Sequence, residues 1–128
     1  MPRERIYSGS KYEELAGYAR AVVDGRFVFV SGTVGADFKT GVFADGAAAQ
    51  TEQALANIRD ALAKAGSRLE DVVRVRVYVP DPGDVMTVSA VLKRHFDKIR
   101  PTNTTICTPL TFPEMKVEIE VTALKPEA

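Results

Sequence analysis

The sequence predicts an α+β fold in which two helices cover one face of a mixed or antiparallel β-sheet. Two segments repeat apolar residues with the helical period, and several others alternate apolar and polar residues with period two. The predicted order is strand, strand, helix, strand, helix, strand, strand, and each amphipathic helix needs a sheet to cover. The chain has 128 residues, the length of one domain, so we expect residues 1–128 to form a single domain.

A β-hairpin is predicted near the N-terminus. Two apolar runs, residues 19–23 and 26–31, flank the dipeptide Asp24-Gly25. This dipeptide is typical of tight hairpin turns because glycine accepts positive φ without a steric cost. We expect Gly32 to end the second strand and residues 33–41 to form a loop or a short extension linked by a turn.

The clearest helix is predicted over residues 44–65. Its apolar face repeats at intervals of three and four and consists of Thr51, Leu55, Ile58, Leu62 and Ala65. We expect Asp45 to cap the first turn, and Gly66 to follow the last turn, where a left-handed residue is favoured. Polar residues on the opposite side, including Gln50 and Asn57, are expected to face water.

A valine-rich strand and a second helix follow. Residues 72–79 are predicted to place Val73, Val75, Val77 and Val79 on one face and Arg74, Arg76 and Tyr78 on the other. The prolines that follow break this strand. A second amphipathic helix is predicted from about Asp84 to Lys98, with Asp84 capping its first turn.

The C-terminal part is predicted to form the last two strands. Pro101 ends the second helix, and the threonines and isoleucine that follow favour extended chain. Residues 117–124 alternate strictly, so one face is apolar and the other carries Glu118 and Glu120. Our functional interpretation concerns the side chains around Asn103, Thr105 and Glu118.

The predicted outer face of the sheet is charged and allows two interpretations. It would carry Arg74, Arg76, Glu118 and Glu120, opposite the face that meets the helices. In a monomer this face is wet. If it meets other subunits, the arginines must pair with the glutamates, because unpaired charges are not buried. The residues alone leave both interpretations open.

The amino-acid composition argues against several kinds of partner and site. Seventeen basic and seventeen acidic residues give zero formal net charge, so neither nucleic acid nor an anionic membrane is an expected partner. One cysteine and one histidine argue against a disulfide framework and against a metal site. No apolar run approaches the ~18 residues of a membrane span, and the N-terminus does not resemble a signal peptide. We expect a soluble cytoplasmic protein.

Six segments resemble, in order and spacing, those of the RidA (YjgF-type) family of reactive-intermediate deaminases. They are residues 17–21 (GYARA), 27–32 (FVFVSG), 50–58 (QTEQALANI), 69–75 (LEDVVRV), 101–105 (PTNTT) and 117–121 (VEIEV). The resemblance implies a chorismate-mutase-like α+β fold and a homotrimer whose sheets form a central barrel. It also implies a small-molecule ligand in each of three clefts between subunits, without a cofactor. Among the two interpretations above, it favours the buried outer face.

The chain departs from the family pattern at Asn103. Deaminating members read Pro-Ala-Arg-Ser in this region, and their arginine grips the substrate carboxylate. Asparagine is neutral and cannot form that bidentate contact. A charge-assisted hydrogen bond contributes about 1.5–3 kcal/mol, so its loss weakens binding roughly ten- to a hundred-fold. We therefore do not expect normal deamination of simple 2-imino acids.

The resemblance also assigns roles to the other candidate residues. Glu118 corresponds to a glutamate that positions a water and is the first catalytic candidate. Thr105, the second, takes the place of a common cysteine, so no thiol role transfers to it. The ligand-binding candidates are Asn103, Tyr18, Ser31, Gly32 and Arg20, the last as a substitute contact for an anion. The structural alternative for Glu118 is an ion pair with Arg74 or Arg76.

Two functions of different classes remain. The first is an enzyme that hydrolyses a small imine, enamine or related reactive metabolite. The second is a non-catalytic trimer that binds a small molecule or a protein in the same clefts. An endoribonuclease or translation inhibitor, as older descriptions of the family have it, has less support, because the chain has no basic channel and one histidine.

Overall fold

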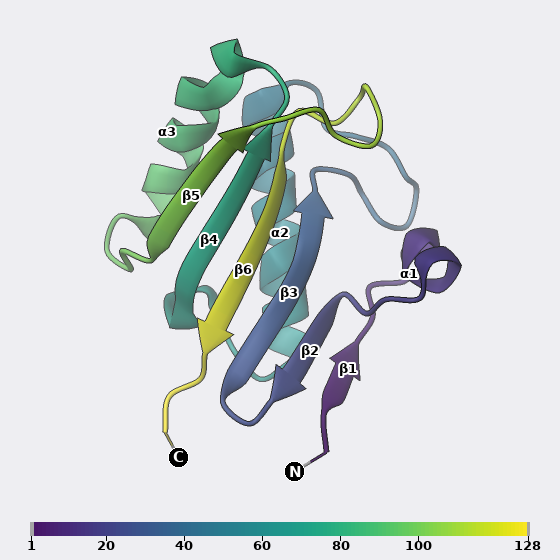
Figure 1. Ribbon diagram of the computed structural model, residues 1–128, viewed down its shortest axis with the longest axis vertical. Coiled ribbons are helices and arrows are strands. Elements are labelled where there is room, and N and C mark those ends of the chain that lie inside the picture. Colours follow the sequence, from purple (N-terminus) through teal and green to yellow (C-terminus); the bar gives the residue numbers. More distant parts are fainter. Residues whose placement is uncertain (1, 128) are drawn as a thin grey trace.

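The predicted α+β fold is confirmed by the computed structural model, which describes residues 2–127. The strands are β1 (Glu4–Ile6), β2 (Ala21–Asp24), β3 (Phe27–Val34), β4 (Val72–Val79), β5 (Thr102–Cys107) and β6 (Glu118–Leu124). The helices are α1 (Lys11–Ala16), α2 (Ala47–Lys64) and α3 (Val85–Phe96). The six strands form one sheet in the order β1-β2-β3-β6-β4-β5. Figure 1 shows α2 and α3 together on one face of this sheet.

All neighbouring strands are antiparallel except β4 and β5, which are parallel, so the sheet is mixed as predicted. The core lies between the sheet and the two long helices. It includes the apolar residues predicted on β6, since Val117, Ile119 and Ala123 are fully buried. None of the helices in residues 2–127 is long and apolar enough to cross a membrane.

The predicted hairpin is confirmed, but the prediction that Gly32 ends its second strand is wrong. β3 continues to Val34 through a bulge, because the pairing with β6 shifts between Val30 and Thr33. Val30 pairs with Val121 and Thr33 pairs with Ile119, so Ser31 and Gly32 together lie opposite one residue of β6. Such an extra residue re-aims the side chains around it.

The apolar face of α2 is confirmed and its predicted cap is wrong. Its predicted wet side is wrong for Gln50 and Asn57 but right for Arg59, Asp60 and Lys64, which are exposed. The helix begins after Gly46, whose φ of 89° turns the chain and leaves Asp45 outside the cap position. Gln50 and Asn57 are buried. Gln50 Nε2 donates to the carbonyls of Ala44 and Glu114 at 3.1 and 2.8 Å, while Asn57 donates to those of Val34 and Ala36. Both amide side chains therefore bond to backbone carbonyls of neighbouring segments instead of to water.

A second bulge corrects the predicted face of Val73. The pairing of β4 with β6 shifts between Val72 and Arg74, so Val72 enters the core and Val73 is 44% exposed. Asp84 also fails to cap α3 with its side chain. Asp81 instead accepts a hydrogen bond from the Gly83 N–H at 2.9 Å, in the short 3₁₀ turn before the helix.

The face of the sheet opposite α2 and α3 carries the predicted charges together with exposed aromatic rings. Arg76 lies 3.7 Å from Glu120, which also accepts a hydrogen bond from the Tyr78 hydroxyl. Phe27 and Phe29 stack with ring centroids 5.9 Å apart and are nearly half exposed. Part of the predicted arginine–glutamate pairing therefore forms within one protomer.

Candidate functional site

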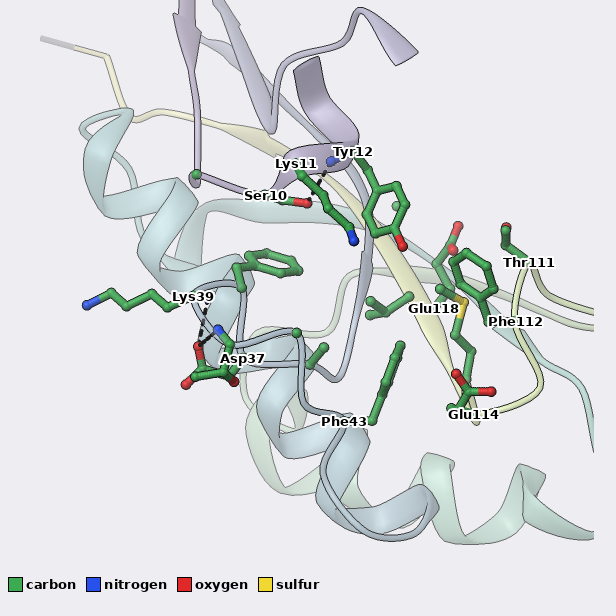
Figure 2. A pocket seen from close by; sticks show the side chains of 18 of the residues that line it. Ser10, Lys11, Tyr12, Asp37, Lys39, Phe43, Thr111, Phe112, Glu114 and Glu118 are labelled. Carbon is green, nitrogen blue, oxygen red and sulfur yellow. Dashed lines mark hydrogen bonds between the residues drawn. The ribbon is translucent and has the colours of Figure 1, made fainter. Parts of the chain in front are cut away.

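The larger cavity lies where β3 and β6 meet three connecting segments. Its volume is about 630 Å³. Residues 9–12 at the start of α1, residues 36–43 after β3, and residues 111–115 before β6 supply most of its wall. Gly32 and Val34 of β3 and Glu118 of β6 complete it, and Figure 2 shows Glu118 among these segments.

Backbone contacts fix the connecting segments that form this wall. Residues 36–43 close on themselves through the bridge between Ala36 and Phe43. Gln50 of α2 holds the segment before β6, since it donates to the Glu114 carbonyl and accepts from the Lys116 N–H at 2.8 Å. The start of α1 meets the same segment through the rings of Tyr12 and Phe112, 5.9 Å apart. The polar face of α2 thus shapes the cavity.

The carboxylate of Glu118 packs directly on the bulge of β3. A side chain added to Gly32 would overlap Oε2 of Glu118, so the glycine makes room for the carboxylate. Within residues 2–127 this carboxylate has neither a hydrogen-bond donor nor an ion-pair partner. Burial raises the pKa of Glu118, the negative charge of Glu120 raises it further, and Arg20 acts in the opposite direction. Glu118 is thus available to accept a hydrogen bond or a proton from a ligand or a water.

Arg20 and Glu13 form a buried ion pair behind the cavity. Arg20 Nε lies 3.0 Å from Glu13 Oε2, and both side chains are 3% exposed. Nη1 of Arg20 donates to the carbonyl of Gly32 at 2.8 Å, and the guanidinium lies 4.9 Å from the centre of the Phe38 ring. The charge of Arg20 is therefore balanced within the protomer, and the pair supports the bulge under Glu118.

Two further predicted residues lie near this pair. The Tyr18 hydroxyl accepts a hydrogen bond from Arg20 Nη2 at 3.4 Å, and Tyr18 lines the cavity. Ser31 does not contribute its side chain to the cavity wall. Its hydroxyl donates to the Ala19 carbonyl at 2.7 Å and so ties β3 to the start of β2.

Asn103 and Thr105 line a different hollow. It is a groove of about 360 Å³ between β5 and α3. The two residues pair with Val75 and Val77 of β4 and so lie on the helix side of the sheet, whereas Glu118 pairs with Tyr78 on the opposite side. The Thr105 hydroxyl donates to Asn103 Oδ1 at 2.8 Å. One protomer thus brings together Tyr18, Arg20, Gly32 and Glu118 but holds Asn103 and Thr105 apart from them.

Several residues of the cavity were not predicted from the sequence. Glu13 occupies a short helix with no periodic signal, and nothing in the sequence marks it as buried. Phe38 lies in the segment 33–41 that we expected to be a loop or a short extension, and Phe43 and Phe112 lie where no helix or strand was predicted. Aromatic side chains among glycines and prolines are the one signal that would have indicated a lined pocket there.

The comparisons with known proteins identify the family. The family model described as Endoribonuclease L-PSP matches residues 9–125. A solved member of the YjgF/YER057c/UK114 family from Mycobacterium tuberculosis is 41% identical, with a TM-score of 0.88 over 96% of this chain and 99% of that chain. The chain belongs to the RidA/YjgF family.

Relatives within the RidA/YjgF family carry the names of different deaminases. The 2-iminobutanoate/2-iminopropanoate deaminase of Salmonella typhimurium is 31% identical over 87% of this chain and 89% of the relative. The 3-aminoacrylate deaminase RutC of Acinetobacter baylyi is 32% identical over 93% of this chain and 95% of the relative. The named substrates therefore vary among proteins equally similar to this one.

Proposed function

We propose that this RidA-family chain hydrolyses a small imine or enamine in a cleft formed between two copies of a homotrimer. The observation that carries the proposal is the carboxylate of Glu118, half-buried in an aromatic cavity with no protein partner in residues 2–127. The names of the Salmonella and Acinetobacter relatives support this reaction class. Because those names differ, they support hydrolysis of a C=N bond or its enamine tautomer without fixing the substrate.

Glu118 accepts a hydrogen bond from the attacking water in the proposed reaction. The imine reacts as its iminium ion: the water oxygen bonds to the iminium carbon, the C=N π electrons move to nitrogen, and Glu118 takes a proton from the water. Glu118 then returns this proton to the nitrogen of the resulting amino alcohol. As the C–N bond breaks and ammonia leaves, the hydroxyl proton passes to the Glu118 carboxylate and the carbonyl product forms. A carboxylate whose pKa is raised by burial suits these proton transfers, because it is a stronger base and its acid form persists to higher pH.

The trimer is proposed because the candidate residues lie on opposite sides of the sheet. β5 is an edge strand, and all six of its residues are exposed in the protomer. An exposed edge strand presents unpaired backbone groups, and covering them is one way in which proteins protect such an edge. In the proposed homotrimer, β5 of one copy closes the cavity of the next and brings Asn103 and Thr105 toward its Glu118. The exposed aromatic pair and the Arg76–Glu120 pair would then lie between copies.

A non-catalytic binding module is the second candidate. It is favoured by the replacement of the usual arginine with Asn103, whose amide oxygen is already bonded to Thr105. The endoribonuclease of the family description has less support. Zero net charge gives no basic footprint, and the single histidine, His95, lies 2.5 Å from Glu52 between α2 and α3, outside the cavity.

A coupled imine assay tests the proposed reaction. An amino acid oxidase supplies imines that carry a carboxylate, an amine oxidase supplies imines that lack one, and release of the carbonyl product is followed. We expect the wild type to accelerate release from at least one imine. Glu118→Gln should lower the rate about a hundred-fold or more, since one general base contributes ~10²–10⁴. A wild type that accelerates neither class would overturn hydrolysis and leave the binding module.

A further inference from the structure

The cavity beside Glu118 has an aromatic wall. Five of the ten aromatic side chains in the sequence line it: Tyr12, Tyr18, Phe38, Phe43 and Phe112. They come from three segments that are distant in sequence. Aromatic faces attract cations because the ring quadrupole is negative above the plane. An apolar body and a positive charge are therefore the two ligand features that this wall accommodates.

Two carboxylates of the cavity wall, Glu114 and Glu118, have neither an ion-pair partner nor a hydrogen-bond donor within residues 2–127, and Glu114 is exposed to solvent. The guanidinium of Arg20 is paired with Glu13 at 3.0 Å, and Asp37 accepts hydrogen bonds from the N–H groups of Lys39 and Thr40. Figure 2 shows the Lys39 side chain extending away from Glu118. Among the carboxylates of this wall within residues 2–127, Glu118 alone combines partial burial with the lack of an ion-pair partner, although the more distant charge of Arg20 lowers its pKa somewhat.

A neighbouring copy does not supply a cation from β5. The six residues Thr102–Cys107 contain no lysine, arginine or histidine. The groove beside that strand contributes Arg100, but its guanidinium is bonded to Asp97 at 2.7 Å. The proposed closure of the cavity thus buries Glu118 further without neutralising it. A buried, unpaired carboxylate is destabilised, and a cationic ligand relieves that cost.

We propose that this cavity selects a small organic cation, a protonated amine or iminium attached to an apolar or aromatic body and lacking a carboxylate. The nitrogen donates to one carboxylate oxygen of Glu118, which leaves the other oxygen to accept from the attacking water, while the body packs against the aromatic wall. The inference deepens the proposed function, since an iminium ion is the form of an imine that water attacks most readily. Binding of an unreactive amine follows from the cavity alone and does not require hydrolysis.

The ammonium group of Lys11 is the feature of the cavity that would favour an anionic ligand over a cationic one. Its side chain is exposed, points toward the cavity in Figure 2, and has Nζ 5.4 Å from the centre of the Tyr12 ring. If Lys11 governs selection, the cavity prefers an anion instead. Its exposure argues against this, because a solvated ammonium contributes less than a desolvated carboxylate to the discrimination of charge.

Isothermal titration calorimetry with three probes of similar shape tests the proposal. The probes are benzylamine, benzyl alcohol and phenylacetate, which are cationic, neutral and anionic at pH 7. We expect benzylamine to bind at least about ten-fold more tightly than benzyl alcohol, and phenylacetate to bind most weakly, consistent with a charge-assisted bond. The affinity for benzylamine should rise with pH as Glu118 loses its proton, with a midpoint above the ordinary value of 4.5.

Two variants decide which residue is responsible. Glu118→Gln should abolish the preference for benzylamine while keeping the fold, which urea unfolding checks. Lys11→Ala removes a positive charge from the cavity wall, so it should keep benzylamine the tightest of the three probes and, if anything, strengthen its binding. The proposal is overturned if phenylacetate binds most tightly, if no probe binds, or if Glu118→Gln binds benzylamine as tightly as the wild type does. If benzylamine binds as expected but no imine is hydrolysed, the proposed reaction is wrong and the cation site stands. If imines are hydrolysed but cations are not preferred, the cation site is wrong and the proposed reaction stands.

Discussion

Glu118 links the chemistry of the cavity to the stability of the fold. Its carboxylate packs on Gly32, is partly removed from water, and faces the charge of Glu120. These contacts raise its pKa because they disfavour the ionised form. A partly buried carboxylate with a raised pKa and no ion-pair partner is typical of a functional position. There the cost in stability accompanies the reactivity of the group.

The raised pKa predicts how stability depends on pH. Between the ordinary value of 4.5 and the raised value, the folded protein holds a proton that the unfolded chain releases. Stability contributed by this group therefore falls as pH rises through that window. Glu118→Gln should raise the melting temperature at pH 7 and have little effect near pH 4. Thermal unfolding of both proteins across this pH range measures the difference, and an equal effect at both pH values would contradict it.

The buried ion pair predicts a large effect at a residue outside the cavity wall. Glu13→Gln leaves the Arg20 guanidinium buried without a counter-charge, and such a change destabilises proteins by about 3–5 kcal/mol. Glu14 is exposed on the same short helix, so Glu14→Gln is the matched control and should change stability by less than ~0.5 kcal/mol. Urea unfolding measures both, and similar free energies of unfolding for the two variants would show that the pair is unimportant.

At the scale of single residues, the sequence identified part of the cavity. The alternation of β6 gives the direction of Glu118, and the family resemblance led us to Tyr18 and Gly32, both of which lie at the cavity. Glu13 could not be predicted, because its burial depends on Arg20 folding back from the start of β2. The resemblance also grouped Asn103 with Glu118, and that grouping stays a prediction because it needs a second copy of the chain.

At the scale of elements, two glycines near the end of β3 have different neighbours. A side chain at Gly32 would meet the flexible end of Glu118, whereas one at Gly35 would overlap the backbone of Gln50 in α2. The bulge of β3 therefore positions a functional group, and the residues just after it set the distance between the sheet and the helix. Substitutions at Gly32 should therefore affect mainly the cavity, and substitutions at Gly35 mainly the stability of the fold.

Alanine at Gly32 should affect ligand binding, whereas alanine at Gly35 should affect the free energy of unfolding. Gly32→Ala displaces the carboxylate of Glu118, so we expect benzylamine binding to weaken about ten-fold with little change in stability. Gly35→Ala forces β3 away from α2 and should destabilise by about 1–3 kcal/mol, as overpacking typically does. Calorimetry and urea unfolding on both variants check this. Intact binding in Gly32→Ala would mean that the carboxylate does not contact the ligand.

Element types were predictable from the sequence, and bulges were not. The periods of α2, β4 and β6 gave the elements and their buried faces. A bulge inserts one residue without changing the composition of a strand, so the exposure of Val73 and the continuation past Gly32 left no signal. Gln50 and Asn57 were assigned to water because a helical pattern does not show which loops cross the helix.

At the scale of the whole molecule, the proposed cleft requires a second copy of the chain. Asn103 and Glu118 lie on opposite sides of the same sheet, so a single protomer cannot use both in one site. We expect sedimentation equilibrium to give three times the 13.9 kDa chain mass. Phe29→Lys places a charge on the exposed aromatic pair and should shift the mass toward that of one chain. A wild type that sediments as a monomer at micromolar concentration would remove the proposed cleft.

Asn103→Arg provides a second prediction at this scale. Introducing the arginine that the family resemblance implies at this position should favour substrates with a carboxylate. In the coupled assay we expect a ten- to hundred-fold rise in kcat/KM for carboxylate-bearing imines, the worth of about one charge-assisted contact. Imines without a carboxylate should not benefit, and a uniform change for both classes would argue against a specific contact.

The most direct measurement is the pKa of Glu118 in the Asn103→Arg variant, followed by NMR of the carboxyl carbon and assigned with Glu118→Gln. If β5 of a neighbouring copy closes the cavity, the new guanidinium lies near Glu118 and lowers its pKa relative to the wild type. Thr87→Arg, on the exposed side of α3, controls for the added charge and should leave the pKa unchanged. An unaltered pKa in Asn103→Arg would contradict the account, because the two residues would then belong to separate hollows.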